Sequence, residues 1–151
     1  MQVMRRILIA LATLAALPAA GRAQSTRDDV SQLLKQAAGE ARQKGYASEA
    51  RVFDSRGIIG MLPRTGSVVL EVNLRAGVRY TVVGVCDTDC VDLDLRAHAP
   101  DGQAVLDEDV STDDVPLLTF TAAETGPHPL AVIMTECRTA LCYFGVKVLA
   151  R

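Results

Sequence analysis

From residue 50 onward, the sequence consists of short apolar runs separated by turn-forming residues, and this pattern restricts the fold more than any other feature. Apolar and polar side chains alternate within the runs, which is typical of β-strands that bury one face. The turns are rich in Gly, Pro and Asp, and they lie at 75–77, 87–89, 100–102, 113–114 and 125–127. The predicted strands are 67–74, 78–86, 91–99, 103–110, 116–122, 128–137 and 142–149, with shorter edge strands at 51–53 and 58–62. Such a series of short strands predicts an all-β fold, a jelly-roll-like antiparallel β-sandwich.

Residues 26–44 show the spacing of an amphipathic α-helix that precedes the sandwich. Thr26 is a candidate N-cap, and Gly45 can end the helix because glycine adopts the left-handed conformation without strain. The apolar stripe consists of Val30, Leu33, Leu34, Ala37, Ala38 and Ala41. This stripe packs against the sandwich or docks a partner protein. Its high alanine content favours packing, because so little apolar area suits a structural contact better than an interface.

The N-terminal residues resemble a cleavable signal peptide. Arg5 and Arg6 precede an apolar run at 7–17, and small residues stand before a cleavage point ahead of Gln24. The alternative is a membrane anchor, but the run is shorter than the roughly 20 residues that a spanning helix needs. The sequence therefore predicts a signal peptide at 1–23, a helix region at 24–45 and a β-sandwich domain at 46–151. We expect export to a periplasm or secretion, without membrane insertion after cleavage.

The four cysteines fall in two close pairs, Cys86 with Cys90 and Cys137 with Cys142. An even number of cysteines in an exported chain indicates disulfides, and we expect the two local pairings among the three that are possible. The alternative is a zinc site with four thiolate ligands. An oxidising compartment disfavours free thiolates, so disulfides are the preferred interpretation.

The charge of the chain restricts its partners. The sequence has 16 basic and 18 acidic residues, and removal of 1–23 deletes three arginines and no acid. The mature chain then carries 13 basic residues and a net charge of −5. Nucleic acids and anionic membranes bind basic surfaces. We therefore expect no nucleic acid as a partner, but an extracytoplasmic protein or polymer.

Ten of the 18 acidic residues lie between Asp87 and Asp114, with Arg96 as the only basic residue in that segment. Alternation puts two of these aspartates on one face of a strand, and an antiparallel hairpin brings two others near them. Close carboxylates repel one another, and calcium relieves this repulsion by binding six to eight oxygens. The predicted calcium ligands are Asp92, Asp94, Asp107, Asp109, Asp113 and Asp114. The alternative is a solvated acidic face that discourages edge pairing of strands.

The acidic segment is not an EF-hand. Residues 107–113 begin like an EF-hand loop, but Thr112 occupies the sixth position, where glycine is needed. Leu118 occupies the twelfth position, where glutamate is needed.

No catalytic motif is present in the sequence. The two histidines, His98 and His128, belong to no nucleophile or zinc-ligand motif, and the HExxH, GxSxG and phosphate-loop patterns are missing. The chain also lacks tryptophan and has only three tyrosines and three phenylalanines. Sugar faces stack on aromatic rings, so this scarcity weakens a carbohydrate-binding interpretation. We expect no catalytic residues and no enzyme activity.

Several short motifs resemble bacterial pre-peptidase C-terminal domains. They lie at 72–80, 92–95, 101–102, Asp107, Asp113, Pro116 and 125–126. The resemblance covers about 65–150 and implies a small β-sandwich with an accessory or binding role, in a family in which some members bind calcium or extracellular polymers. The chain is similar to the short, free-standing exported form with paired cysteines. It departs from the family at Gly126-Pro127-His128, where Gly-x-Tyr is common.

These observations lead to three functional hypotheses. The first and preferred one is an exported, non-catalytic β-sandwich module that is stabilised by calcium and binds an unknown ligand. The second is a secreted interaction protein, an inhibitor or an envelope subunit, that docks through the helix at 26–44. The third is a hydrolase whose site matches no known motif.

Overall fold

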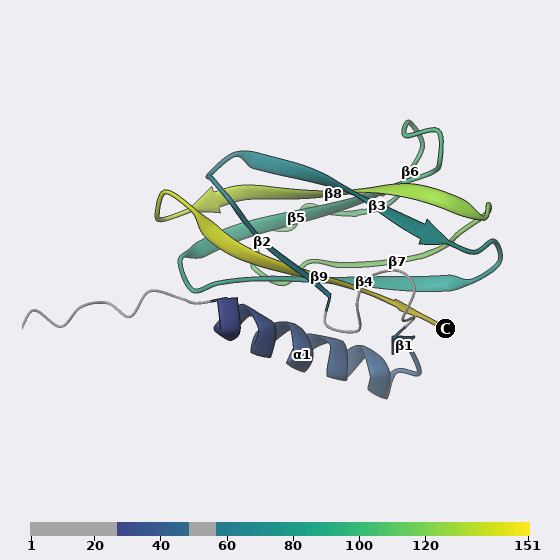
Figure 1. The fold of residues 1–151 in the computed structure, drawn as a ribbon, viewed down its shortest axis with the longest axis horizontal. Helices are drawn as coiled ribbons and strands as arrows, with labels where there is room; N and C mark the ends of the chain where they lie inside the picture. The colour runs from purple at the N-terminus through teal and green to yellow at the C-terminus, as the bar shows by residue number, and fades with distance from the viewer. Residues whose placement is uncertain (1–26, 49–56) are drawn as a thin grey trace, which may run out of the picture.

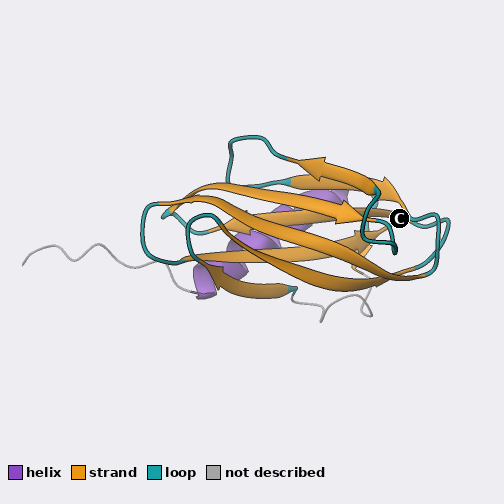
Figure 2. Ribbon diagram, turned by 90° about the horizontal axis from the view of Figure 1, so that it is seen from above, coloured by secondary structure: helices purple, strands orange, loops and turns teal. Residues whose placement is uncertain are grey.

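Two antiparallel β-sheets pack face to face, and one helix covers the outer face of one of them (Figures 1 and 2). The computed structural model describes residues 27–48 and 57–151. Sheet A contains β1 (Ala47–Ser48), β9 (Cys142–Ala150), β4 (Arg79–Cys86) and β7 (Leu117–Thr121) in this order, and β2 (Ile58–Leu62) also pairs with β9. Sheet B contains β3 (Gly66–Leu74), β8 (Gly126–Cys137), β5 (Cys90–His98) and β6 (Val105–Asp109). The predicted β-sandwich fold, preceded by a helix, is confirmed.

Strands β2 to β9 agree with the predicted runs to within one or two residues at their ends, and the short run at 58–62 is β2, whereas the two-residue strand β1 was not predicted. The run at 51–53 lies outside the described residues. β6 begins two residues later than expected, at Val105. The reason is Asp101, whose Oδ1 accepts hydrogen bonds from the N–H groups of Gln103 (2.9 Å) and Ala104 (3.1 Å). Because this local turn includes the residues up to 104, β6 begins only after it.

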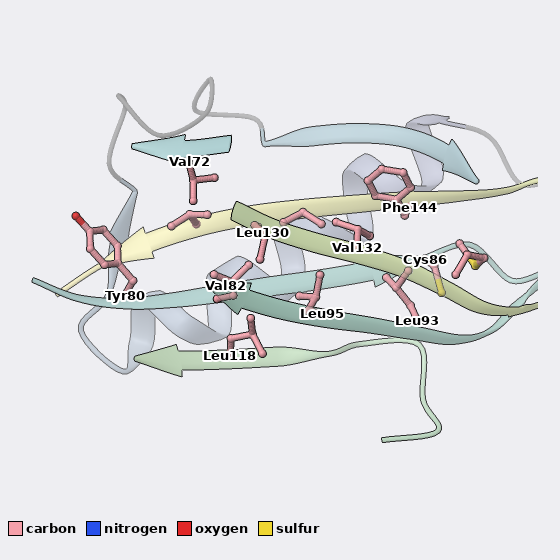
Figure 3. Close-up of a cluster of buried hydrophobic side chains, with 14 of the residues drawn as sticks. Val72, Tyr80, Val82, Cys86, Leu93, Leu95, Leu118, Leu130, Val132 and Phe144 are labelled. Carbon is pink, nitrogen blue, oxygen red and sulfur yellow. The ribbon is translucent and has the colours of Figure 1, made fainter. Parts of the chain in front are cut away.

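The core lies between the two sheets, because alternate residues of each strand point inward. Leu93, Leu95, Leu118, Leu130 and Val132 are almost fully buried there (Figure 3). Each such side chain contributes about 1.5–3 kcal/mol relative to exposure. Because both sheets supply inward-facing residues, neither sheet buries its apolar face without the other.

The helix α1 (Arg27–Gln43) packs against the outer face of sheet A. Its buried residues Val30 and Leu34 contact Val85, while Ala38 packs with Val83. As a result, β4 and β9 are buried on both faces. The structure therefore places the apolar stripe against the sandwich, which leaves the polar side of the helix to solvent. One stripe residue differs from expectation, since Leu33 is 40% exposed.

Candidate functional site at the disulfide end

Both disulfides lie at one end of the sandwich, where the chain crosses between the sheets (left-hand end of Figure 1). Cys86–Cys90 closes the connection from β4 to β5, and Cys137–Cys142 closes the connection from β8 to β9. The two predicted local pairings are confirmed. The zinc alternative is wrong, because none of the four cysteines is a free thiol that could supply a thiolate ligand.

Asp87 joins the two disulfide-closed connections. Its Oδ1 accepts hydrogen bonds from the N–H groups of Asp89 (3.2 Å) and Cys90 (3.1 Å), and its Oδ2 accepts one from Tyr143 (2.8 Å). The Asp87 N–H donates in turn to the Tyr143 carbonyl (3.1 Å). The residue is only 4% exposed. The sequence pattern predicts only a turn residue at this position. The signal that marks its role is an aspartate directly after the first cysteine of a short Cys-x3-Cys loop.

The two connections form one surface, which we name the double loop and define as residues 87–89 and 138–141, and in its first part Thr88 is exposed, Asp89 is half-buried and Asp87 is buried. The N–H of Arg138 donates to the Asp89 carbonyl (2.8 Å), and its Nη1 donates to the Thr88 carbonyl (3.3 Å). Within the second loop, Thr139 Oγ1 donates to the Leu141 carbonyl (2.9 Å). Residues 138–141 are all exposed. The double loop therefore presents its side chains on a backbone that hydrogen bonds and disulfides hold in place.

Asp92 and Asp94 lie on β5 beside the double loop, in an acidic environment. A β-bulge interrupts the pairing on both sides of Asp92, which stands opposite Glu136. Asp94 Oδ2 accepts a hydrogen bond from Thr135 Oγ1 (2.9 Å). The Oδ1 atoms of both aspartates are buried and have no hydrogen-bond partner among the described residues. Such atoms are costly, because a buried acceptor without a donor retains its desolvation penalty.

The surroundings of Asp92 raise the pKa of its carboxyl group. Burial is the largest cause, since the residue is 8% exposed, and the charges of Asp94, Asp113 and Glu136 add to it. The N–H of Asp113 acts in the opposite direction and lowers the pKa. The carboxyl group of Asp92 therefore holds a proton more strongly than an aspartate in solution does.

Asp107 and Asp109 lie on β6, on the opposite face of sheet B from Asp94. They stand across from Ala97 and Leu95, whose side chains point into the core. From this inner side, Asp109 Oδ2 accepts the N–H of Leu117 (2.9 Å), and Asp107 Oδ2 accepts the N–H of Thr119 (2.6 Å). Both donors belong to β7, the edge strand of sheet A. The two aspartates thus bridge the sheets and cap an open strand edge.

The hydrogen bonds also change the acidity of Asp109. Burial raises the pKa of this carboxyl group, but the N–H groups of Leu117 and Ser111 stabilise its ionised form. The net result is a lowered pKa.

Asp113 and Asp114 lie in the connection between β6 and β7, with exposed side chains. Their carbonyl groups accept the N–H of Leu93 (3.0 Å) and of Cys86 (3.2 Å), so this connection is held to both sheets. The structure therefore does not bring the six predicted calcium ligands together. Among residues 27–48 and 57–151, no group of three or more His, Cys, Asp or Glu side chains is arranged to hold a metal ion. Calcium binding stays a prediction.

A separate groove of about 430 Å³ runs between α1 and β7. Ala37, Val83 and Leu117 form part of its apolar lining, and Lys44 and Arg79 contribute positive charge. Glu40 offsets part of this charge from the same groove. The groove is of the size of a small-molecule site, but its exposed, mixed charges do not single out one ligand.

The helices of the described segments give no candidate membrane span, as none is both long and apolar enough.

Comparison with solved structures supports the fold through one of the two proteins described here. No protein-family model and no curated protein sequence matches the chain. The chain is similar in structure to a periplasmic inhibitor of g-type lysozyme from Aeromonas hydrophila, with 13% identity and a TM-score of 0.50 over 72% of this chain and 90% of that one. A carbohydrate-binding module solved with β-1,4-galactotriose gives 19% identity and a TM-score of 0.38, over 63% of this chain and 69% of that one. At such identities the likeness to the inhibitor shows a shared fold alone.

Proposed function

We propose that the protein is an exported, non-catalytic module that binds another protein outside the cytoplasm, as a secreted inhibitor does. The observation that carries this proposal is the double loop, in which two disulfides and the Asp87 carboxylate hold exposed side chains in place. A surface that is ordered before binding loses less conformational entropy on association. The disulfides support a periplasmic or extracellular location, because they persist in oxidising compartments.

The shared fold suggests which partner to test first. The Aeromonas hydrophila protein is named as a periplasmic inhibitor of g-type lysozyme. We propose that the partner of this chain is likewise an enzyme that acts outside the cytoplasm, and g-type lysozyme is the available probe. The helix is the less favourable docking element, because its apolar stripe is already buried on sheet A.

The test follows the clearing of a peptidoglycan suspension by g-type lysozyme while the exported protein, purified with both disulfides formed, is added in increasing amounts. We expect clearing to slow with each addition and to stop near an equimolar ratio. The matched control carries Cys137→Ser and Cys142→Ser, which frees residues 138–141 and weakens inhibition. Unchanged clearing at a large excess, with no complex on size-exclusion chromatography, would contradict a lysozyme partner.

A second candidate function rests on the unpartnered oxygens of Asp92 and Asp94. We propose calcium stabilisation of an accessory module, as the resemblance to pre-peptidase C-terminal domains implies. A divalent cation beside these oxygens relieves the repulsion between their charges. The test is thermal unfolding in calcium and then in excess chelator. We expect calcium to raise Tm by about 4 °C, and Asp92→Asn with Asp94→Asn to abolish the shift. If the wild type melts identically in calcium and in excess chelator, calcium does not stabilise the protein, and these aspartates are only a solvated acidic face.

A further inference from the structure

We infer that the double loop is the contact surface for the partner protein. In the complex, Leu141 enters an apolar pocket of the partner, and basic residues line the rim of that pocket. This inference rests on the proposed protein-binding function. It names the surface and the chemistry of the partner, which is an extracytoplasmic protein with a positively charged cleft.

The first support is the position of Leu141. Its side chain is 50% exposed, although the next residue, Cys142, is completely buried in a disulfide. The hydrogen bond from Thr139 Oγ1 to the Leu141 carbonyl holds the backbone directly at this residue. A large apolar side chain on a fixed backbone is suited to anchor an interface, because little entropy is lost when it is buried.

The second support is the neighbouring apolar side chain of Met61. The strand register places Met61 opposite Tyr143, two residues along the chain from Leu141. Met61 is 49% exposed. The apolar surface therefore extends from the double loop onto β2, and the methionine side chain can adapt to the shape of a pocket. Two half-exposed anchors at one end of the sandwich distinguish this surface from a single surface leucine.

The third support is the charge around these anchors. Asp89, Asp113, Asp114 and Glu136 lie at this end of the sandwich, against Arg138 and Arg64. Beneath this surface, Asp92 is more than nine-tenths buried, and its Oδ1 meets no donor among the described residues. The end therefore carries an excess of negative charge. A partner with a basic rim is attracted to it and is orientated before contact.

The experiment measures binding of g-type lysozyme to three forms of the exported, oxidised protein by biolayer interferometry. The test variant is Leu141→Ala, and the matched control is Leu33→Ala, a leucine of similar exposure on α1. We expect Leu141→Ala to weaken binding about 10- to 30-fold and Leu33→Ala to leave it within about twofold. Both variants should melt like the wild type, because both side chains are already partly in solvent.

A charge variant tests the rim. Glu136→Lys should slow association about tenfold at low salt and much less at high salt, since ions screen the attraction. If Leu141→Ala binds like the wild type, or if Leu33→Ala is the variant that weakens binding, the inference is overturned while the proposed function stands. If the wild type does not bind lysozyme at all, the proposed partner fails, and this inference fails with it.

Discussion

Two pairs of aspartates on neighbouring strands of sheet B have the same sequence pattern and opposite environments. Asp107 and Asp109 accept N–H groups of β7, and these bonds close the edge of sheet A. Asp92 and Asp94 on β5 each have one buried oxygen that has no partner in the described structure. The difference teaches that alternation selects the face of a strand on which a carboxylate lies. Whether the carboxylate stabilises the fold depends on the backbone that approaches that face.

The largest loss of stability is expected at Asp87. Like Asp107 and Asp109, this residue accepts hydrogen bonds from backbone N–H groups, but it is buried. Asp87→Ala removes the carboxylate that accepts the N–H groups of Asp89, Cys90 and Tyr143, and the Cys90 N–H keeps a second bond, to the backbone carbonyl of residue 87 (3.0 Å). We expect a loss of about 3–5 kcal/mol in the free energy of unfolding, measured by urea denaturation with the disulfides intact. Asp89→Ala is the control and should change the value by less than about 0.5 kcal/mol. Equal losses in both variants would show that Asp87 has no special role.

An intermediate effect is expected for the edge-capping pair. Asp107→Ala combined with Asp109→Ala removes the acceptors of the Leu117 and Thr119 N–H groups. We expect a loss of about 2 kcal/mol, because both bonds are charge-assisted but partly exposed. Hydrogen exchange should accelerate at these two amides, whereas Asp114→Ala should leave them protected. Unchanged exchange in the double variant would contradict the capping role.

The smallest change in the free energy of unfolding is expected at Asp92, where substitution should stabilise the protein and not destabilise it. Because the pKa of Asp92 is raised, its ionised form costs stability above the folded-state pKa, and this cost is relieved as pH falls toward the unfolded value near about 3.9. Asp92→Asn should therefore stabilise the protein at pH 7 by about 0.5–1 kcal/mol, or roughly 2–4 °C in Tm. The gain should disappear between pH 7 and about 4.

The control for this prediction is Asp109→Asn, because the pKa of Asp109 is lowered. Its ionised form stabilises the protein above about pH 3.9, and that stability is lost as pH falls through the folded-state pKa. The two variants should thus shift Tm in opposite directions at pH 7. A destabilised Asp92→Asn variant at pH 7 would remove the contrast between the two pairs.

The sequence alone was sufficient for strands β2 to β9, the helix and the disulfide pairing, but not for the two-residue strand β1. Alternation with a period of two depends on neighbouring residues, and so do the turn preferences of Gly, Pro and Asp. The cysteine pairs were predictable for a similar reason, since the two cysteines of each pair stand only four or five positions apart in the sequence. These properties depend on residues close together in the sequence, so they can be read from the sequence alone.

Only the tertiary structure decided which carboxylates meet which partners. The register between β5 and β6 sets Asp107 and Asp109 opposite core residues, whereas the irregular pairing of β5 with β8 sets Asp92 opposite Glu136 and Asp94 opposite Ile133. Asp87 gained its role because Tyr143, 56 residues away in the chain, brings its N–H to the same carboxylate. Register, bulges and contacts between distant strands depend on how the two sheets pack together, and no local pattern in the sequence contains that information.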